Sequence, residues 1–383
     1  MIEEISDVRR GVRALRVPRG LLFHDPLRWR LFSTPADLAE GKLRGFLEKN
    51  GLHADAPAPK QQPRLRQLFW VRVEDLPSRE VRTRPGARFA CACCGQSCQT
   101  MKLGPLLPAD VERLRRADWN GTGRDRSTFF VDEHDQPLGE YSDAFLRREG
   151  SRCQFLRDDN LCEVHARFGA MTKPLMCRMF PYVFRATPAA VAVGMRLGEC
   201  ASAPAAAKGL PVVEQHDDLR RMLSEHDAIG LVPPSVWASP DRLITWEEYE
   251  RIESDLLARP VGGFAAAVFR AFETAPSPKP GLDDLVAKIG LPNRPPRKLD
   301  PEAAELEDRF CRAVLFSKEL FLHQDLARAA ALLVIKAHLA RIEVADGSPA
   351  AINQVWKTSA DRPLRDLCRD LDVRGIAASI AAS

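Results

Sequence analysis

The most informative segment of the chain reads Phe89-Ala-Cys91-Ala-Cys93-Cys94-Gly95-Gln-Ser97-Cys98. Two residues separate Cys91 from Cys94, and this spacing lets two thiolates of one turn reach the same metal ion at about 2.3 Å. Gly95 tolerates a positive φ and lets backbone N–H groups approach the sulfurs. Cys98 follows four residues after Cys94 and is placed to close the same site. The pattern indicates a metal-binding turn.

Further cysteines follow in three segments. Cys153 and Cys162 flank the turn signal Arg157-Asp-Asp-Asn160, which predicts a hairpin-like loop with one cysteine on each arm. Cys177 lies between Pro174 and Pro181, where the two prolines favour irregular backbone. Cys200 comes after the strand-like run 191–195.

The chain has ten cysteines, and eight of them lie between residues 91 and 200. The acidic N-terminus has no apolar leader segment, so we expect a cytoplasmic protein. Thiols stay reduced in that compartment, which favours metal ligation over disulfides. Cys311 and Cys368 fall in helical patterns and are expected to be inert core thiols. The candidate metal ligands are Cys91, Cys93, Cys94, Cys98, Cys153, Cys162, Cys177 and Cys200.

Residues 86–200 resemble the YkgJ-type cysteine-cluster family, a zinc- or iron-chelating domain. Its pattern is F-x-C-x-x-C-G-x-C-C, then C-x-F-L…C-x-[IV]-[HY], then P-x-x-C-R-x-[FY]-P. The matching residues here are Phe89, Cys91, Cys94, Gly95 and Cys98, then Cys153, Phe155, Leu156, Cys162, Val164 and His165, then Pro174, Cys177, Arg178, Phe180 and Pro181. One position departs from the pattern, because Ser97 stands where the family has a cysteine, while Cys93 is an additional thiol.

The resemblance implies an iron–sulfur cluster or zinc. A zinc ion or a four-iron cluster each needs four thiolates. Six or seven thiolates could therefore form one centre with spare thiols, two separate sites, or one site with bridging sulfurs. His165 follows Cys162 at C-x-x-H spacing, and is either a mixed ligand or a partly buried helix histidine. Arg178 either lowers the pKa of Cys177 or forms an ion pair with Asp158 or Asp159.

Two other functions compete with metal binding. The cysteine core followed by a long helical region also resembles the flagellin lysine-N-methylase branch, which implies S-adenosylmethionine and protein-lysine methylation. No local motif supports that cofactor, because Gly121-Thr-Gly123 does not follow an apolar strand. The second alternative is a zinc-scaffolded interaction protein that docks through its C-terminal helices. No catalytic residue can be assigned from the sequence.

The remaining chain predicts an α+β, mostly helical protein around an irregular cysteine-rich core. Residues 1–53 form an expected strand–strand–helix module, with strands in 12–33 and a helix over 37–48. A Pro-rich linker over 54–64 and a strand at 68–73 precede the cysteines, in a metal-binding domain over 65–205. The region 210–383 is expected to be helical, with a Pro-rich linker near 274–300. Its helices are predicted at 214–229, 245–258, 260–273, 282–290, 303–321 and 325–343, and Thr245 and Glu248 form a capping-box candidate.

The charge and the hydropathy of the sequence restrict the kinds of partner that we expect. The net charge is +4, which is too small for the basic patch of a nucleic-acid-binding protein. No run of 18 apolar residues exists, so no membrane span is expected. The more basic N-terminal third is either a solvated face or a surface for a protein or peptide partner.

Overall fold

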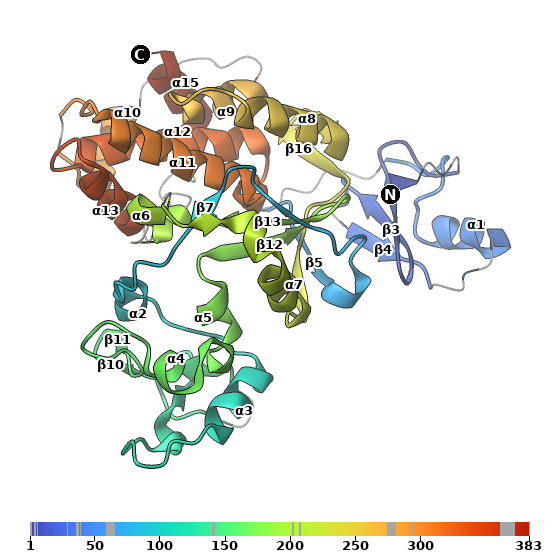
Figure 1. The fold of residues 1–383 in the computed structure, drawn as a ribbon. Helices are drawn as coiled ribbons and strands as arrows, with labels where there is room; N and C mark the ends of the chain where they lie inside the picture. The colour runs from blue at the N-terminus through green and yellow to red at the C-terminus, as the bar shows by residue number, and fades with distance from the viewer. Residues whose placement is uncertain are drawn as a thin grey trace. The chain divides into compact units, whose positions relative to one another are not determined.

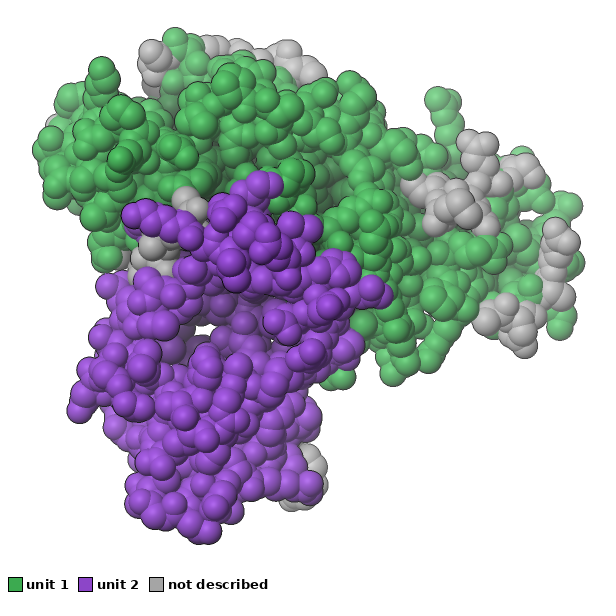
Figure 2. Space-filling model, in the orientation of Figure 1, with its two compact units in different colours: residues 1–85, 184–195, 226–383 green, residues 86–183, 196–225 purple. Residues whose placement is uncertain are grey.

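The computed structural model describes residues 2–3, 5, 7–28, 30–35, 38, 40–58, 66–139, 142–200, 203–206, 208–273, 281–292, 294–360 and 372–382. The chain forms two compact units (Figure 2). Unit 1 comprises residues 1–85, 184–195 and 226–383, and unit 2 comprises residues 86–183 and 196–225. These limits differ from the expected boundaries at 65 and 205, because the strands on either side of the cysteines belong to a sheet of unit 1. The α+β class is confirmed.

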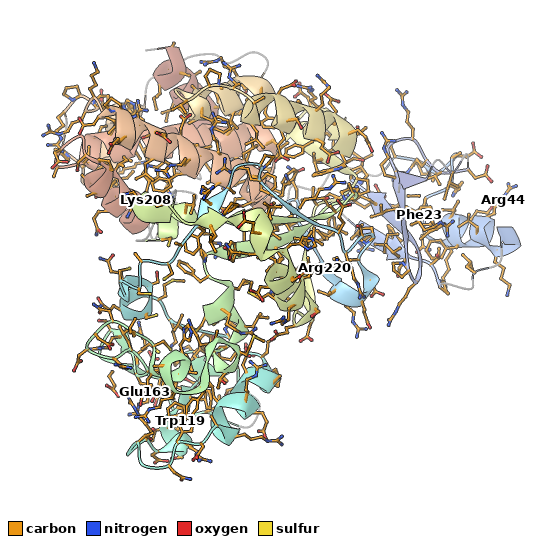
Figure 3. The ribbon with its side chains drawn as sticks, in the orientation of Figure 1. Phe23, Arg44, Trp119, Glu163, Lys208 and Arg220 are labelled. Carbon is orange, nitrogen blue, oxygen red and sulfur yellow. The ribbon has the colours of Figure 1, made fainter. Side chains whose placement is uncertain are left out.

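The N-terminal module is a four-stranded antiparallel sheet of unit 1, in the order β1-β2-β3-β4. Its strands are β1 (Ile2–Glu3), β2 (Arg13–Val17), β3 (Gly20–Asp25) and β4 (Arg30–Ser33), and helix α1 (Glu40–Lys49) follows. Phe23, labelled in Figure 3, is buried with Leu47 of α1 and Leu52. A β-carbon at Gly20 would lie 2.6 Å from the carbonyl oxygen of Thr34, so only glycine fits this turn. The predicted strands and helix are therefore present, with two further strands.

A five-stranded sheet forms the centre of unit 1, in the order β5-β15-β12-β13-β6. Its strands are β5 (Phe69–Arg72), β15 (Ala228–Leu231), β12 (Tyr182–Ala186), β13 (Val191–Met195) and β6 (Val81–Thr83). The first two residues of β12 are counted with unit 2. The predicted strand at 68–73 is confirmed as β5. The helix expected over 214–229 is wrong at its end, because α7 (His216–Ser224) stops and β15 begins at Ala228.

Helices and one hairpin complete unit 1 (Figure 1). The hairpin joins β16 (Ser235–Ser239) to β17 (Arg242–Thr245), which the sequence analysis did not predict. The Thr245 hydroxyl accepts the backbone N–H of Glu248 at 3.3 Å, so the Thr245 half of the predicted capping box is confirmed. The Glu248 carboxylate pairs with Arg242 at 2.6 Å. The helices are α8 (Trp246–Leu257), α9 (Phe264–Phe272), α10 (Leu282–Ile289), α11 (Pro301–Phe316), α12 (Leu326–Glu343), α13 (Pro349–Ala360) and α15 (Val373–Ala382). Among the described residues, no helix is both long and apolar enough to cross a bilayer.

A buried ion pair joins α8 to the turn after α11. The Lys318 ammonium lies 2.5 Å from Oε1 of Glu253, and both side chains are almost fully buried. The Tyr249 hydroxyl donates to the same oxygen at 3.2 Å. Because each charge has a partner, the pair avoids the desolvation cost of an isolated buried ion.

Unit 2 consists of short elements. They are β7 (Arg88–Phe89), α2 (Gln96–Thr100), α3 (Pro108–Arg116), β8 (Phe130–Val131), β9 (Phe145–Leu146), β10 (Arg148–Glu149), β11 (Arg152–Cys153), α4 (Glu163–Phe168), α5 (Leu175–Met179), α6 (Ala203–Ala206), β14 (Leu210–Pro211) and α7. The described residues also form six short 3-10 turns, η1 (Val73–Asp75), η2 (Arg126–Thr128), η3 (Ala170–Thr172), η4 (Leu197–Glu199), η5 (Val212–Gln215) and η6 (Glu319–Leu322). Because the helices and strands of unit 2 are short, an aromatic core provides much of its packing. Trp119 stacks on Phe155 at 5.3 Å between ring centroids, and Phe129 and Phe168 pack edge-on against Trp119 (Trp119 is labelled in Figure 3).

Candidate metal centre

The first cysteine segment is a turn between β7 and α2. Cys93 adopts a positive φ of 52°, and its backbone N–H donates to Sγ of Cys91 at 3.4 Å. Gly95 has a φ of 66° and starts α2, which carries Cys98. A backbone N–H pointing at a sulfur stabilises thiolate charge, and such bonds also tune metal–sulfur centres. The local backbone therefore has the form that the sequence predicted for a metal-binding turn.

The second segment is a closed loop that carries a cysteine on each side. Leu156 and Cys162 form an isolated antiparallel bridge, and the Arg157 N–H donates to the Leu161 carbonyl at 2.9 Å. Cys153 ends β11 just before this loop and is buried. The predicted hairpin-like loop is confirmed.

The first segment packs directly on the second. A β-carbon at Gly95 would lie 3.0 Å from the Asn160 side chain and 3.2 Å from Cδ1 of Leu156. Nε2 of Gln99, one residue after Cys98, donates to Oδ1 of Asn160 at 3.2 Å. Cysteines that are about sixty residues apart in the chain are thus brought into one region of unit 2.

The third segment is helical, which corrects the expectation of irregular backbone at Cys177. Residues Leu175–Met179 form α5, because Pro174 precedes the first helical residue instead of interrupting the helix. Asp110 of α3 is buried and accepts the Leu175 N–H at 2.9 Å. This carboxylate satisfies one of the N–H groups that a helix N-terminus leaves without a partner, and it positions the helix that carries Cys177.

Arg178 does not pair with Asp158 or Asp159, which is a second correction. Its Nη1 lies 2.9 Å from Oε1 of Glu225, at the end of α7, and its Nε donates to the Lys173 carbonyl. The two aspartates pair instead with arginines of their own loop, Asp158 with Arg152 and Asp159 with Arg157. The side chain after Cys177 therefore serves to fasten α5 to α7.

Seven thiols lie close enough to influence each other's ionisation. The pKa of Cys153 is raised to about 12, chiefly by burial and in part by charge on Cys98 and Cys162. The pKa of Cys177 is raised chiefly by burial and in part by charge on Cys153, Cys98 and Cys162. The pKa of Cys98 is likewise raised by burial first, with a contribution from charge on Cys162. All six pairs within the set Cys98, Cys153, Cys162 and Cys177 are thus in electrostatic contact. We call this set the four-thiol set.

The turn cysteines form an adjoining group. Charge on Cys91 is the main cause of the raised pKa of Cys93, and Cys94 adds to it. Charge on Cys91 and Cys94 also raises the pKa of Cys98, which links the turn to the four-thiol set. Cys91 and Cys93 are exposed, whereas the four-thiol set lies in or against the aromatic core. Lys173 is the neighbouring cation, and it lowers the pKa of Cys93, Cys98 and Cys177.

The remaining predicted residues lie elsewhere. Cys200 is buried in unit 2 at the end of η4. His165 is an exposed residue of α4, so the expectation of a partly buried histidine is wrong. Cys311 is buried in α11 of unit 1, as expected of a core thiol, and Cys368 lies outside the described residues. Gly121 and Gly123, weighed for a cofactor loop, both have positive φ between α3 and η2.

The donor set suits a soft metal, although its side chains do not yet form a coordination sphere. Within the described part of the chain, no cysteine forms a disulfide bond. In the same residues, no three His, Cys, Asp or Glu side chains have the arrangement of a metal site. Thiolates select zinc, Cu(I) or iron–sulfur, and four are sufficient for a zinc ion or a four-iron cluster. The cysteines present therefore match these metals in donor type and number, while the described residues lack the arrangement of a metal site.

The residues that support this region were not predicted from the sequence. Asp110, Glu225 and the aromatic core around Trp119 position the cysteine segments, and none belongs to a cysteine motif. The nearest signal was the helix start at Pro108, which predicts a short helix but not the contact that its Asp110 makes.

Comparison with known proteins adds no relative. The chain matches no protein-family model, no curated protein and no solved structure.

Proposed function

We propose that unit 2 binds a metal centre, zinc or an iron–sulfur cluster, through the thiolates of Cys98, Cys153, Cys162 and Cys177. The observation that carries the proposal is the packing of all four residues at one place: Cys153 lies in the aromatic core of unit 2, and Cys98, Cys162 and Cys177 pack against that core. Charge on neighbouring thiols of the set also contributes to the raised pKa of Cys98, Cys153 and Cys177. Three segments supply the four residues: α2, the 153–162 loop and α5. A set drawn from distant segments is typical of sites in which the metal contributes to folding.

The other turn cysteines have a separate role in this proposal. Cys91 and Cys93 are exposed and Cys94 is half-buried, and charge on Cys91 and Cys94 reaches Cys98. We assign these three residues to the cover of the centre, where the Cys93 N–H donates to the Cys91 sulfur. Zinc at such a site would stabilise the fold, and an iron–sulfur cluster would also exchange electrons.

Metal analysis of variants tests this assignment. We expect anaerobically purified protein to contain stoichiometric metal. An absorption band at about 400 nm would identify an iron–sulfur cluster. The double substitution Cys153→Ser/Cys177→Ser should abolish metal binding. Cys93→Ser should retain the metal, and so should the control Cys311→Ala, which removes a buried thiol of unit 1. Full metal content in the double variant would contradict the proposal.

The methyltransferase and interaction-protein alternatives stay predictions. Calorimetry with S-adenosylmethionine separates the first from simple metal binding, since only a methyltransferase requires that ligand. Stoichiometric zinc in a colourless protein that binds no S-adenosylmethionine would favour a zinc scaffold with a protein or peptide partner.

A further inference from the structure

A cleft of about 410 Å³ lies in unit 1, between helices α8 and α9 and the start of β17. The two helices lie next to each other in the upper part of Figure 1. The volume of the cleft falls within the range of small-molecule sites, about 300–1,000 Å³. Ile252 and Leu256 of α8 and Ala267 of α9 provide an apolar lining.

Four arginines line the same cleft. They are Arg242 of β17, Arg251 of α8, Arg259 just after the end of α8, and Arg270 of α9. Arg242 pairs with Glu248 at 2.6 Å and is neutralised. The side chains of the other three arginines have no ion-pair partner among the residues that the structure describes. Asp255 is the acidic residue of the lining, so the cleft keeps an excess of two positive charges.

The end of α8 is arranged so that it does not repel an anion. The carbonyl groups of a helix C-terminus carry partial negative charge. Here the buried Arg312 donates to the carbonyls of Leu257, Arg259 and Pro260 at 2.8, 2.8 and 3.2 Å. This covers the negative end of the helix dipole and fixes the backbone at Arg259.

We propose that this cleft binds a small organic phosphate monoester. A phosphate monoester carries about −1.5 to −2 charges at pH 7, which matches the excess of two positive charges better than one carboxylate does. Guanidinium groups bind phosphate oxygens through paired hydrogen bonds, and the apolar lining accommodates the organic part. The cleft belongs to unit 1, whereas all the cysteines proposed as metal ligands belong to unit 2.

Calorimetry on the full-length protein tests the proposal, with adenosine monophosphate and glucose 6-phosphate as probes. We expect saturable binding of at least one probe, weaker binding of inorganic phosphate and no binding of adenosine. Arg251→Gln/Arg270→Gln should weaken binding at least tenfold, and Asp255→Asn should strengthen it. The control Arg220→Gln changes an exposed arginine of α7 and should leave the affinity unchanged.

Two outcomes would overturn the proposal. The first is that neither probe binds at millimolar concentration to protein whose circular dichroism is that of the folded chain. The second is that a probe binds the double arginine variant as tightly as the unaltered protein. The Asp255→Asn variant keeps the test informative if the double variant is poorly folded, because unchanged or weaker binding there would also contradict the charge argument.

Discussion

The side-chain amide of Gln99 donates a 3.2 Å hydrogen bond to Oδ1 of Asn160, joining α2 to the loop between Cys153 and Cys162. Gly95, at the start of α2, leaves space for this contact, since a β-carbon there would lie 3.0 Å from the same asparagine. The contact links the helix that carries Cys98 to the loop that ends at Cys162.

Gly95→Ala should therefore disturb the metal centre as well as the local backbone. Alanine at a left-handed position costs about 1–2 kcal/mol. Gly121→Ala is the matched control, because Gly121 has a similar φ of 72° but a β-carbon there would meet no atom within 4 Å. We expect both variants to lose stability and only Gly95→Ala to lose metal, measured by elemental analysis. Equal metal content in the two variants would show that the contact does not matter.

Metal removal should unfold unit 2 in preference to unit 1. A site assembled from separate segments makes metal binding part of the folding free energy. After chelation at neutral pH, limited proteolysis followed by mass spectrometry should show new cleavage sites within 86–200. Identical cleavage patterns and identical far-UV circular dichroism before and after chelation would contradict this expectation.

Asp110→Asn should weaken metal binding without touching a cysteine. One oxygen of the buried carboxylate accepts the Leu175 N–H, and the other pairs with Arg113 at 2.8 Å. Asparagine has one acceptor oxygen in place of two, so one of these two contacts must be lost and α5 is held less firmly. Loss of such a bond costs about 1–3 kcal/mol. A competition titration with a chromogenic chelator should report lower affinity. Glu112→Gln, on the exposed side of α3, is the control and should be neutral.

Acid should destabilise the N-terminal module through His24. Burial lowers the pKa of His24 from 6.5 to about 3, and both ring nitrogens are buried without a hydrogen-bond partner among the described residues. Between these two values the unfolded chain binds one more proton than the folded chain, so stability falls as the pH falls below 6.5. At pH 5 the loss is about 2 kcal/mol, at about 1.4 kcal/mol per pH unit.

The control for this effect is His24→Phe, which keeps an aromatic ring against Phe69. Urea titrations at pH 7 and pH 5, with pulse-labelling mass spectrometry of the β2 and β3 peptides, would follow the module alone. The unaltered protein should lose about 2 kcal/mol more than the variant between the two pH values. An equal loss in both proteins would assign the acid sensitivity to other groups.

Local signals in the sequence were sufficient for some elements of the fold. The N-terminal strands alternate apolar and polar residues, and Thr245 is a cap residue three positions before Glu248, so both were predicted. β12 and β15 were not, because short buried runs such as Ala228–Leu231 have no helical or strand period, and their partners are distant in the chain.

The candidate site, like the fold, was predicted only in part. Spacing and turn residues predicted the two cysteine loops, because their geometry depends on neighbouring residues. The orientation of α5 depends on Asp110 and Glu225, which lie 65 and 47 residues from their partners. Nothing in a single sequence marks such long-range pairs. The four thiols were therefore predicted only as members of a set of eight, and the folded chain distinguishes them by their packing in and against the aromatic core.

X-ray absorption spectroscopy at the metal edge would identify the atoms bound to the metal in unit 2. We expect sulfur neighbours at about 2.3 Å, with four cysteine sulfurs for zinc, or sulfur with a short iron–iron distance for a cluster. These sulfur neighbours should be lost in Cys153→Ser/Cys177→Ser and retained in Cys311→Ala. Neighbours that are nitrogen or oxygen, or protein that binds neither metal when supplied under reducing conditions, would contradict the proposed metal centre.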